Sequence, residues 1–414
     1  MAAGPDVLVI GAGLAGLRCA GVLAAAGRDV RVWEAGDDVG GRVRTDEVDG
    51  FLCDRGFQVL NPAYPELERS VDVAALRLQT FRAGVAIRRQ LGAALLVHPL
   101  REPALVPRML ASGAVRPREA LALARWALPA LRPAKLKSRR DDDTLRRSLD
   151  RCGAHGELRR TVDRFLAGVL LDDSGGTSNA FGLLLARMFL FGVPGLPAGG
   201  MRSLPRRLAE PLAGRISLNH KMTHFEHGGG RWTVHGPETT TARDVVVATG
   251  PVTAAALTGA PTPATHAVVT DWWAADEAPP GPPMLWVDSR SDPPGPVVNT
   301  AVISAAAPTY APPGRHLISA SALLGPDRAA PPETAMRRHA AEILGIDGGR
   351  WESVTRHVVE HALPAQPPPL AVRRPVHIRD GLWWCGDHRD TASIQGALVS
   401  GRRTAEALLR QRRP

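Results

Sequence analysis

A glycine-rich segment at the start of the chain constrains its fold more than any other feature. Residues 7–10, Val-Leu-Val-Ile, form a continuous apolar run typical of a buried parallel strand, and Gly-Ala-Gly-Leu-Ala-Gly follows at 11–16. In this spacing the first glycine allows a sharp turn, the second lets backbone approach a pyrophosphate, and the third lets a helix pack close to the strand. The pattern predicts a helix over residues 14–26 whose N-terminus is offered to phosphate.

A second strand is predicted over residues 29–33, after Gly27 ends the helix. Glu34 follows this strand, at the position where an acidic side chain accepts hydrogen bonds from an adenosine ribose. Strand, glycine turn, helix and acid all occur at the expected spacing. The segment therefore predicts a dinucleotide-binding domain.

The residues after Glu34 narrow the choice of nucleotide. Glu34-Ala35 is followed, after a short gap, by Gly40-Gly41-Arg42. This combination resembles the extended fingerprint of the FAD-binding superfamily that includes flavin-containing amine oxidases, protoporphyrinogen oxidases and phytoene desaturases. Two glycines and an arginine would add a second close backbone approach and a cation beside the pyrophosphate. The resemblance implies FAD, held non-covalently because no cysteine lies in a recognisable flavin-attachment motif.

The C-terminal segment, residues 382–410, resembles the last FAD motif of the same superfamily. Gly386-Asp387 follows a predicted strand, and a helix then begins around Gly396-Ala397. The resemblance implies that the acid contacts ribityl or pyrophosphate groups. It also implies that the helix N-terminus points at the flavin pyrimidine carbonyl, where its dipole stabilises negative charge.

Three further segments are expected around the cofactor. Residues 51–60 predict a strand and a glycine turn facing the flavin ring, residues 215–222 a strand ending at an adenine-binding backbone, and residues 243–251 a buried strand ending in a glycine turn. The predicted cofactor-binding residues are Gly11, Gly13, Leu14, Ala15, Gly16, Glu34, Ala35, Gly41, Arg42, Gly56, Phe57, Met222, Gly250, Gly386, Asp387, Ser393, Ile394 and Ala397.

The predicted fold is α/β: a three-layer, Rossmann-type FAD-binding domain with a parallel sheet, interleaved with an α+β substrate domain that contains an antiparallel sheet. Residues 1–80, 198–254 and 372–414 are assigned to the FAD-binding domain, and residues 81–197 and 255–371 to the substrate-binding domain. We expect residues 81–197 to be largely helical. Apolar strands separated by proline-rich turns are expected over residues 255–371.

Composition sets outer bounds on the class of protein. With 414 residues, 44% hydrophobic and 22% charged, the chain suits a two-domain globular protein. No N-terminal signal peptide and no apolar run of about 20 residues is visible. The four cysteines have no CxxC spacing and no metal-ligand partners, so we expect reduced thiols, no metal site and a cytoplasmic location.

The positive charge is concentrated in one segment. Residues 88–140 hold twelve Lys or Arg and two acids, while the rest of the chain has 39 of each sign. Apolar clusters alternate with these basic residues. The segment suits contact with an anionic membrane, the mouth of a site for an anionic substrate, or a solvated basic cap. Nucleic acid is disfavoured, because no stacking aromatics are interleaved.

The resemblance implies removal of two electrons from a small organic substrate, with oxygen or another acceptor reoxidising the flavin. No second GxGxxG unit for NAD(P)H is present. Amine oxidases place an aromatic residue where this chain has Ser393, and many use a lysine near the flavin, whereas the three lysines here are Lys135, Lys137 and Lys221. We therefore predict a dehydrogenase, desaturase or oxidase acting on a hydrophobic substrate, and we assign no catalytic residue.

Three alternatives stand beside this prediction. Amine oxidation is weakened by Ser393 but stays open, and so does a redox-neutral, flavin-dependent isomerase. A non-enzymatic carrier is the third, because Rab GDP-dissociation inhibitors resemble this fold without flavin. Intact Gly11, Gly13, Gly16 and Glu34 argue against the carrier.

Overall fold

A six-stranded sheet forms the half of the protein that carries the glycine-rich segment. The computed structural model describes residues 4–131 and 141–411. Strands lie in the order β19–β20–β13–β1–β2–β9, and only the β19–β20 edge pair is antiparallel. The strands are β1 (Val7–Ile10), β2 (Val30–Trp33), β9 (Ile216–Ser217), β13 (Asp244–Val247), β19 (His377–Arg379) and β20 (Leu382–Trp384). The fully apolar β1 lies between β2 and β13, so its carboxyl end is central in the sheet.

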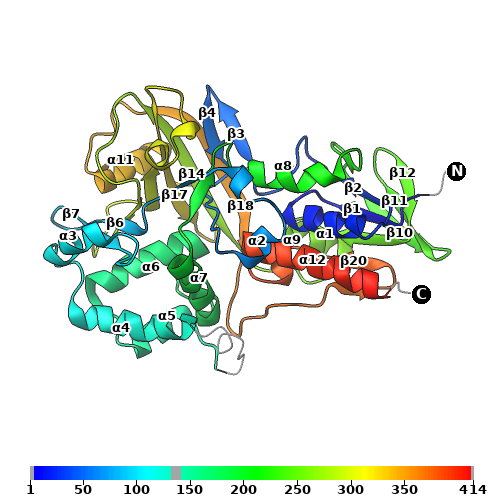
Figure 1. Ribbon diagram of the computed structural model, residues 1–414, viewed down its shortest axis with the longest axis horizontal. Coiled ribbons are helices and arrows are strands. Elements are labelled where there is room, and N and C mark those ends of the chain that lie inside the picture. The colour runs from blue at the N-terminus through cyan, green and yellow to red at the C-terminus, as the bar shows by residue number, and fades with distance from the viewer. Residues whose placement is uncertain (1–3, 132–140, 412–414) are drawn as a thin grey trace.

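Helices from both ends of the chain cover this sheet. They are α1 (Leu14–Ala25) and α12 (Ile394–Gln411), with α8 (Ser203–Ala209) and α9 (Pro251–Thr258) beside the sheet. A Cβ on Gly401 of α12 would lie 2.2 Å from the Ala15 carbonyl oxygen of α1, so glycine permits the two backbones to touch. The first and last helices therefore pack directly together (Figure 1).

A seven-stranded sheet forms the other half. Its order is β18–β14–β17–β16–β15–β6–β7, and every pairing is antiparallel except β15–β6. The strands are β6 (Gly84–Arg88), β7 (Ala93–Val97), β14 (Thr265–Ala275), β15 (Leu285–Asp288), β16 (Val297–Val302), β17 (His316–Leu324) and β18 (Glu352–Pro364). α11 (Glu333–Leu344) covers one face, while α6 (Gly156–Leu170) packs against β15–β17 on the other.

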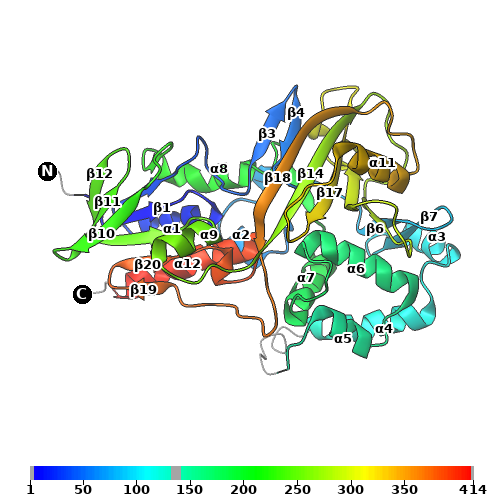
Figure 2. The same cartoon turned by 180° about the vertical axis from the view of Figure 1, so that it is seen from behind.

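A group of helices continues from α6. It consists of α3 (Val106–Ala111), α4 (Pro117–Ala127), α5 (Leu145–Arg151) and α7 (Asn179–Phe191). Figure 2 shows these helices at the same end of the molecule as the seven-stranded sheet, with α1 and β1 at the other. The remaining elements are β3 (Thr45–Val48), β4 (Phe51–Asp54), β5 (Leu78–Thr80), β8 (Gly195–Pro197), β10 (His224–Gly228), β11 (Arg231–His235), β12 (Thr239–Ala242), α2 (Pro65–Glu68) and α10 (Ile303–Ala306).

The parallel and antiparallel sheets confirm the predicted α/β fold class. All six strands of the first sheet fall in residues 1–80, 198–254 and 372–414, and all seven of the second in residues 81–197 and 255–371. The division into two domains at these boundaries stays a prediction.

Two local expectations were wrong. Residues 84–97 form the β6–β7 hairpin, turned at Gly92 with φ 74°, rather than helix. A short apolar run does not by itself distinguish strand from helix, and here pairing with β15 decides. The strand expected over residues 215–222 is only β9, because the chain leaves the sheet edge after Ser217.

Candidate functional site

The three glycines of the first turn have different neighbours. Gly11 has φ 107°, and its N–H donates to the Trp33 carbonyl across 2.7 Å. A Cβ on Gly16 would lie 2.0 Å from the Gly11 oxygen, whereas a Cβ on Gly13 would meet nothing within 4 Å. Gly11 and Gly16 are thus required by the protein's own packing. Gly13 faces open space, as a pyrophosphate-facing backbone requires.

Glu34 lies against this turn. Its Oε2 accepts a hydrogen bond from the Ala12 N–H at 2.7 Å, and its Oε1 accepts one from the Gly36 N–H at 2.8 Å. Gly13 forms an isolated bridge with Gly40, and the position of a Cβ on Gly41 is 3.3 Å from the Gly13 Cα. The glycine turn, the acid and the second glycine pair are therefore in direct contact. Leu14 and Ala15, at the start of α1, are buried, and Ala35 is exposed.

Arg42 connects this surface to the C-terminal segment. Its Nη2 donates to Asp387 Oδ1 across 2.6 Å, and its Nη1 donates to the Ala362 carbonyl across 2.7 Å. The Gly386 N–H donates to Ser400 Oγ of α12. The structure thus brings the two predicted FAD motifs together through a direct ion pair.

Gly56 and Gly250 both leave space beside them. A Cβ on either would meet nothing within 4 Å, and Gly56 has φ 89°. Phe57 packs edge-on against Phe81. Gly250 precedes α9 and follows β13. Because β1 and β13 are parallel neighbours, Gly250 and Gly11 lie beyond the carboxyl ends of adjacent strands. Met222 is buried in the core formed around β1 and β13.

Ser393 caps α12 rather than offering a free side chain. Its Oγ accepts from the Gly396 N–H at 3.0 Å, and its carbonyl accepts from the Ala397 N–H at 2.9 Å. A Cβ on Gly396 would lie 1.9 Å from the Thr391 oxygen, so the turn into the helix requires glycine there. Ile394 packs against the core beneath α1.

Some of the buried polar atoms without a hydrogen-bond partner lie in or beside these segments, while others, such as those of His98 and Asp271, lie in other parts of the described chain. Among the described residues, Gln58 Oε1, Thr249 Oγ1, both His388 ring nitrogens and both Gln366 amide atoms have no hydrogen-bond partner. Burial lowers the pKa of His388 to about 4, so its imidazole is neutral at pH 7. Buried polar groups are nearly always paired, so the unpartnered atoms of Gln58, Thr249 and His388, each next to a predicted cofactor residue, fit a bound polar group such as FAD.

Sequence reasoning missed these four residues. Gln58, Thr249 and His388 are within a residue of predicted positions, so proximity to a motif was the available signal. Gln366 follows β18, and no sequence pattern marks it.

A cavity of about 340 Å³ begins at the N-terminus of α12. Its walls are mainly apolar side chains of α7, of residues 370–372 and of α12, and Ser393 lies in its lining. The charged residues around it are Asp142, Arg187, Arg373 and Asp390. The cavity has the size and apolar character of a small-molecule site.

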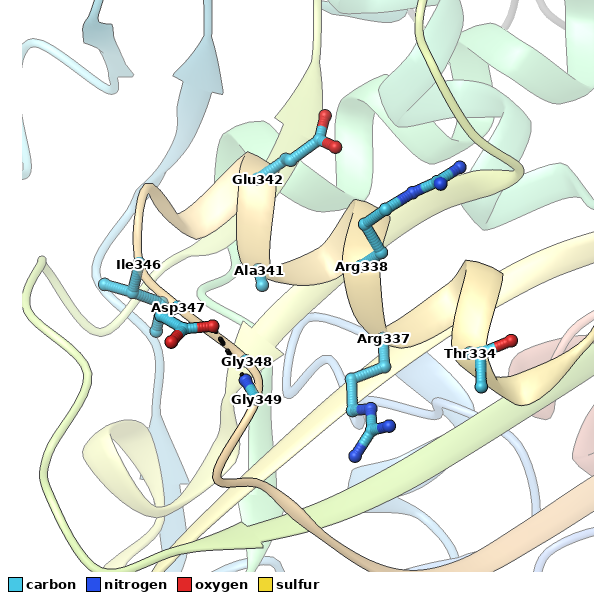
Figure 3. A pocket seen from close by; sticks show the side chains of 9 residues that line it. All are labelled: Thr334, Arg337, Arg338, Ala341, Glu342, Ile346, Asp347, Gly348 and Gly349. Atoms are coloured by element: carbon cyan, nitrogen blue, oxygen red, sulfur yellow. Dashed lines mark hydrogen bonds between the residues drawn. The ribbon is translucent and has the colours of Figure 1, made fainter.

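A second recess of about 340 Å³ lies on the outer side of α11 (Figure 3). Four charged residues, Arg337, Arg338, Glu342 and Asp347, are among those that line it, and Asp347 accepts from the Gly349 N–H within it. It contains none of the predicted site residues. It is therefore not the candidate active site.

Several other features bear on the chemistry. Cys19, Cys53, Cys152 and Cys385 are all unpaired. In the part of the chain that the structure describes, no three His, Cys, Asp or Glu residues are grouped to hold a metal ion. No helix among residues 4–131 and 141–411 is both long and apolar enough to cross a membrane.

This fold, with a parallel sheet and a glycine turn at the end of its central strand, is that of a dinucleotide-binding protein, and segments from both ends of the chain meet beside the turn. Residues 14–409 match the family described as flavin containing amine oxidoreductase. The chain belongs to this family. It is thereby classed with FAD-dependent oxidoreductase enzymes, which confirms the predicted superfamily, enzyme class and cofactor.

Known relatives agree with this assignment. Putrescine oxidase of Kocuria rosea is 30% identical over 284 residues, which is 59% of this chain and 57% of that enzyme, so the match spans little more than half of the relative. An oxidoreductase from Methanosarcina mazei has a similar structure, with a TM-score of 0.74 at 19% identity over 97% of this chain and 99% of that one. A fatty acid isomerase from P. acnes gives 0.70 at 15% identity, over 98% of each chain. Both structural likenesses show the fold alone.

Proposed function

We propose that this protein removes two electrons from a hydrophobic organic substrate, as a dehydrogenase, desaturase or oxidase. The observation that carries the proposal is the largely apolar cavity that reaches Ser393 at the start of α12. When bound, FAD supplies the acceptor for the two electrons. The substrate itself must then be selected by the side chains of the cavity.

The protein's own residues have three tasks in this proposal. Gly13, Gly56 and Gly250 leave room for the cofactor. Arg42 and Asp387 hold the two motifs together, and the apolar walls exclude water from the substrate. We assign no side chain as a proton acceptor, and FAD is proposed to be held non-covalently.

Amine oxidation is the first alternative, favoured by the likeness to putrescine oxidase. Ser393 provides no aromatic wall, and a cation entering an apolar pocket needs one or a similar partner to replace its lost hydration. Lys221, the one lysine among the described residues, is exposed. A redox-neutral isomerase is the second alternative, and its support is likeness of fold alone.

Anaerobic mixing of the FAD-loaded protein with candidate substrates tests the reaction. A hydrophobic compound with an activated C–H bond should bleach the oxidised flavin band, while simple amines should bleach it slowly or not at all. Rapid bleaching by putrescine or another simple amine would assign the protein to amine oxidation. Product formation only with reduced flavin, with no net bleaching, would assign it to isomerisation.

A surface that we call the leucine–arginine surface supports contact with an anionic membrane. Exposed leucines there have 51–89% of their surface accessible, and exposed arginines alternate with them. The residues are Leu91, Leu100, Leu110, Leu121, Leu128 and Leu131, with Arg101, Arg108, Arg116, Arg118 and Arg125.

Not all of the basic segment contributes to this surface. Arg88 donates to the Ile343 carbonyl and Arg89 pairs with Glu157, so both bind within the protein. The predicted contribution of residues 132–140 lies outside the described residues. Since exposed apolar and basic side chains alternate along residues 91–131, we propose a peripheral membrane contact instead of a purely solvated cap.

A further inference from the structure

The cavity beside α12 is lined by apolar side chains and by four charged residues. A ligand that contacts both kinds of residue needs an apolar part and a charged part. Phe181, Leu185 and Leu370 are buried in the protein while lining it, and Leu184 and Met188 extend the wall along α7. A ligand that fills this space gains by removing apolar surface from water. The interior alone would accept any apolar chain or ring.

The acids around the cavity are already engaged by the protein. Asp142 Oδ1 accepts from the Ala180 N–H, and its Oδ2 accepts from Ser178 Oγ and the Leu370 N–H, both at 2.7 Å. These bonds fix the start of α7 to the chain that follows β18. The Asp142 carboxylate is thus a structural cap, with its oxygens occupied.

The second acid is engaged in a similar way. Asp390 Oδ1 accepts from the Thr391 N–H at 3.0 Å, and its Oδ2 pairs with Arg403 at 3.2 Å. Both carboxylates are therefore already hydrogen-bonded within the protein, and Asp390 is also paired with a cation.

The two arginines that line the cavity are in the opposite situation. Within the described parts of the chain, neither Arg187 nor Arg373 has a carboxylate within 4.0 Å. Arg187 donates one Nη1 hydrogen bond to the Ala130 carbonyl, and its guanidinium lies 4.6 Å from the Phe191 ring centre. Both guanidinium groups thus keep donors for an anion.

The backbone presents Arg373 in an unusual conformation. Its φ is 53°, in the left-handed region that arginine rarely adopts, and the residue is exposed. Strain of this kind persists where the surrounding structure enforces it, often at ligand sites. The conformation places a cationic residue at the cavity lining.

Other arginines lie close to Arg373 and add to the positive charge around it. Burial, together with repulsion from Arg374 and Arg403, lowers the pKa of Arg389 to about 10. Arg374 donates to the Ala371 carbonyl, and Arg389 to the Pro375 carbonyl. Arg374 and Arg389 are thus held by carbonyl oxygens, which do not neutralise them, whereas Arg403 pairs with Asp390.

We infer that this cavity binds an amphiphilic anion, with the apolar part between α7 and α12 and the carboxylate or phosphate at Arg187 and Arg373. This inference rests on the proposed function, because it names the substrate class of the same site. A ligand of this kind satisfies both the apolar walls and the unpaired guanidinium groups. A neutral or cationic ligand of the same length satisfies only the walls.

Calorimetric titration of the FAD-loaded protein tests this, with dodecanoate, dodecyl phosphate, dodecanol and dodecylamine below their micelle-forming concentrations. Both anions should bind at least tenfold more tightly than the alcohol or the amine. Arg187→Gln and Arg373→Gln should each weaken anion binding about fivefold to twentyfold and leave dodecanol unchanged. Arg338→Gln, on α11 far from the cavity, is the matched control and should have no effect.

Leu184→Trp locates the binding, because the larger side chain would occupy the cavity and should abolish it. Equal or tighter binding of dodecylamine, unchanged binding in both arginine variants, or full binding in Leu184→Trp would overturn the inference. The titration needs no turnover. Arginine-dependent anion binding without flavin reduction by any substrate would support this inference and contradict the proposed function. Bleaching of the flavin by a neutral hydrophobic compound, with no selectivity for anions in binding, would support the proposed function and contradict this inference.

Discussion

Arg42 and Asp387 are 345 positions apart in the chain, and their side chains meet with Nη2 and Oδ1 separated by 2.6 Å. Asp387 is nearly buried, and Arg42 also holds the Ala362 carbonyl at the end of β18. The first glycine-rich segment, the last strand of the second sheet and the C-terminal motif therefore converge on one guanidinium. We therefore expect this ion pair to contribute to cofactor retention.

We expect Asp387→Asn to weaken FAD binding about fivefold, because the pair loses its charge while the hydrogen-bond geometry survives. The predicted loss of FAD binding is small because Arg42 is partly exposed to solvent, so the charge of the pair contributes only about 1 kcal/mol. Flavin retained per protein during dialysis measures it. Glu210→Gln, which breaks an exposed ion pair with Arg207 on α8, is the control and should retain FAD fully. Equal retention in both variants would contradict the placement of Asp387 at the cofactor.

Gly13→Leu should give a folded protein that does not retain FAD. A Cβ at this position meets no protein atom within 4 Å, so the added side chain would occupy only the space assigned to the pyrophosphate. The apoprotein should unfold within a degree or two of wild-type apoprotein in a thermal scan, and its flavin absorbance should be absent.

Gly16→Ala is the contrasting variant. Its Cβ would lie 2.0 Å from the Gly11 oxygen, so we expect the apoprotein itself to lose about 1–3 kcal/mol of stability. If Gly13→Leu retained FAD, or if it destabilised the apoprotein as much as Gly16→Ala, the division of roles between the two glycines would be wrong.

Asp54 should make stability fall between about pH 4 and pH 6. Burial raises its pKa to about 6, against hydrogen bonds from Thr45, the Met201 N–H and Tyr310 that lower it. In this window the folded state keeps the proton that the unfolded state has lost, so the free energy of unfolding decreases as pH rises.

Asp54→Asn removes that titration while keeping the shape of the side chain. We expect the variant to gain stability relative to wild type by about 1–3 kcal/mol from pH 4 to pH 7. Urea unfolding of both proteins at several pH values measures the difference. A difference that stays constant with pH would show that Asp54 titrates at its ordinary pKa.

Glu66 is a buried acid whose loss should destabilise the FAD-binding half. It pairs with Arg18 of α1 at 3.0 Å and with Arg402 of α12 at 2.9 Å, and only 1% of its side chain is exposed. Glu66→Ala would leave two half-buried cations facing each other, at a cost of about 3 kcal/mol. Thermal unfolding of Glu68→Ala, an exposed acid in the same short helix, should be unchanged. A similar melting temperature for both variants would contradict the role of Glu66.

The leucine–arginine surface should bind vesicles that contain anionic lipid. Leu121→Asp with Leu128→Asp should abolish co-sedimentation, because the variant loses apolar contact and adds charges of the wrong sign. Val358→Asp, which changes an exposed apolar residue on β18, should sediment like wild type. Binding that persists at high salt, or that ignores lipid charge, would argue against an electrostatic contact. Absence of binding at low salt would contradict the membrane contact and favour the alternative that this segment is a solvated basic cap.

Local signals in the sequence predicted α1 and its flanking strands to within about one residue, because glycine spacing and apolar runs act over short distances. The prediction of helix for the β6–β7 hairpin was wrong, since β6 joins the sheet by pairing with β15, about two hundred residues away. The bonds of Arg42 and the bond between Glu66 and Arg402 join residues more than three hundred positions apart, so no local pattern reveals them. Ser393 was recognised by its motif, but its role as a helix cap required the folded turn.

The close packing of Gly401 on Ala15 affects how this protein is made. The ribosome delivers β1 and α1 first, yet their neighbours β13, β20 and α12 come from the last 171 residues of the chain. A nascent chain in which α12 has not yet been synthesised contains the complete glycine turn but lacks the helix that packs on α1. We therefore expect the nucleotide-binding half to close only once α12 has been made, and the side of α1 that packs on α12 to stay exposed until then.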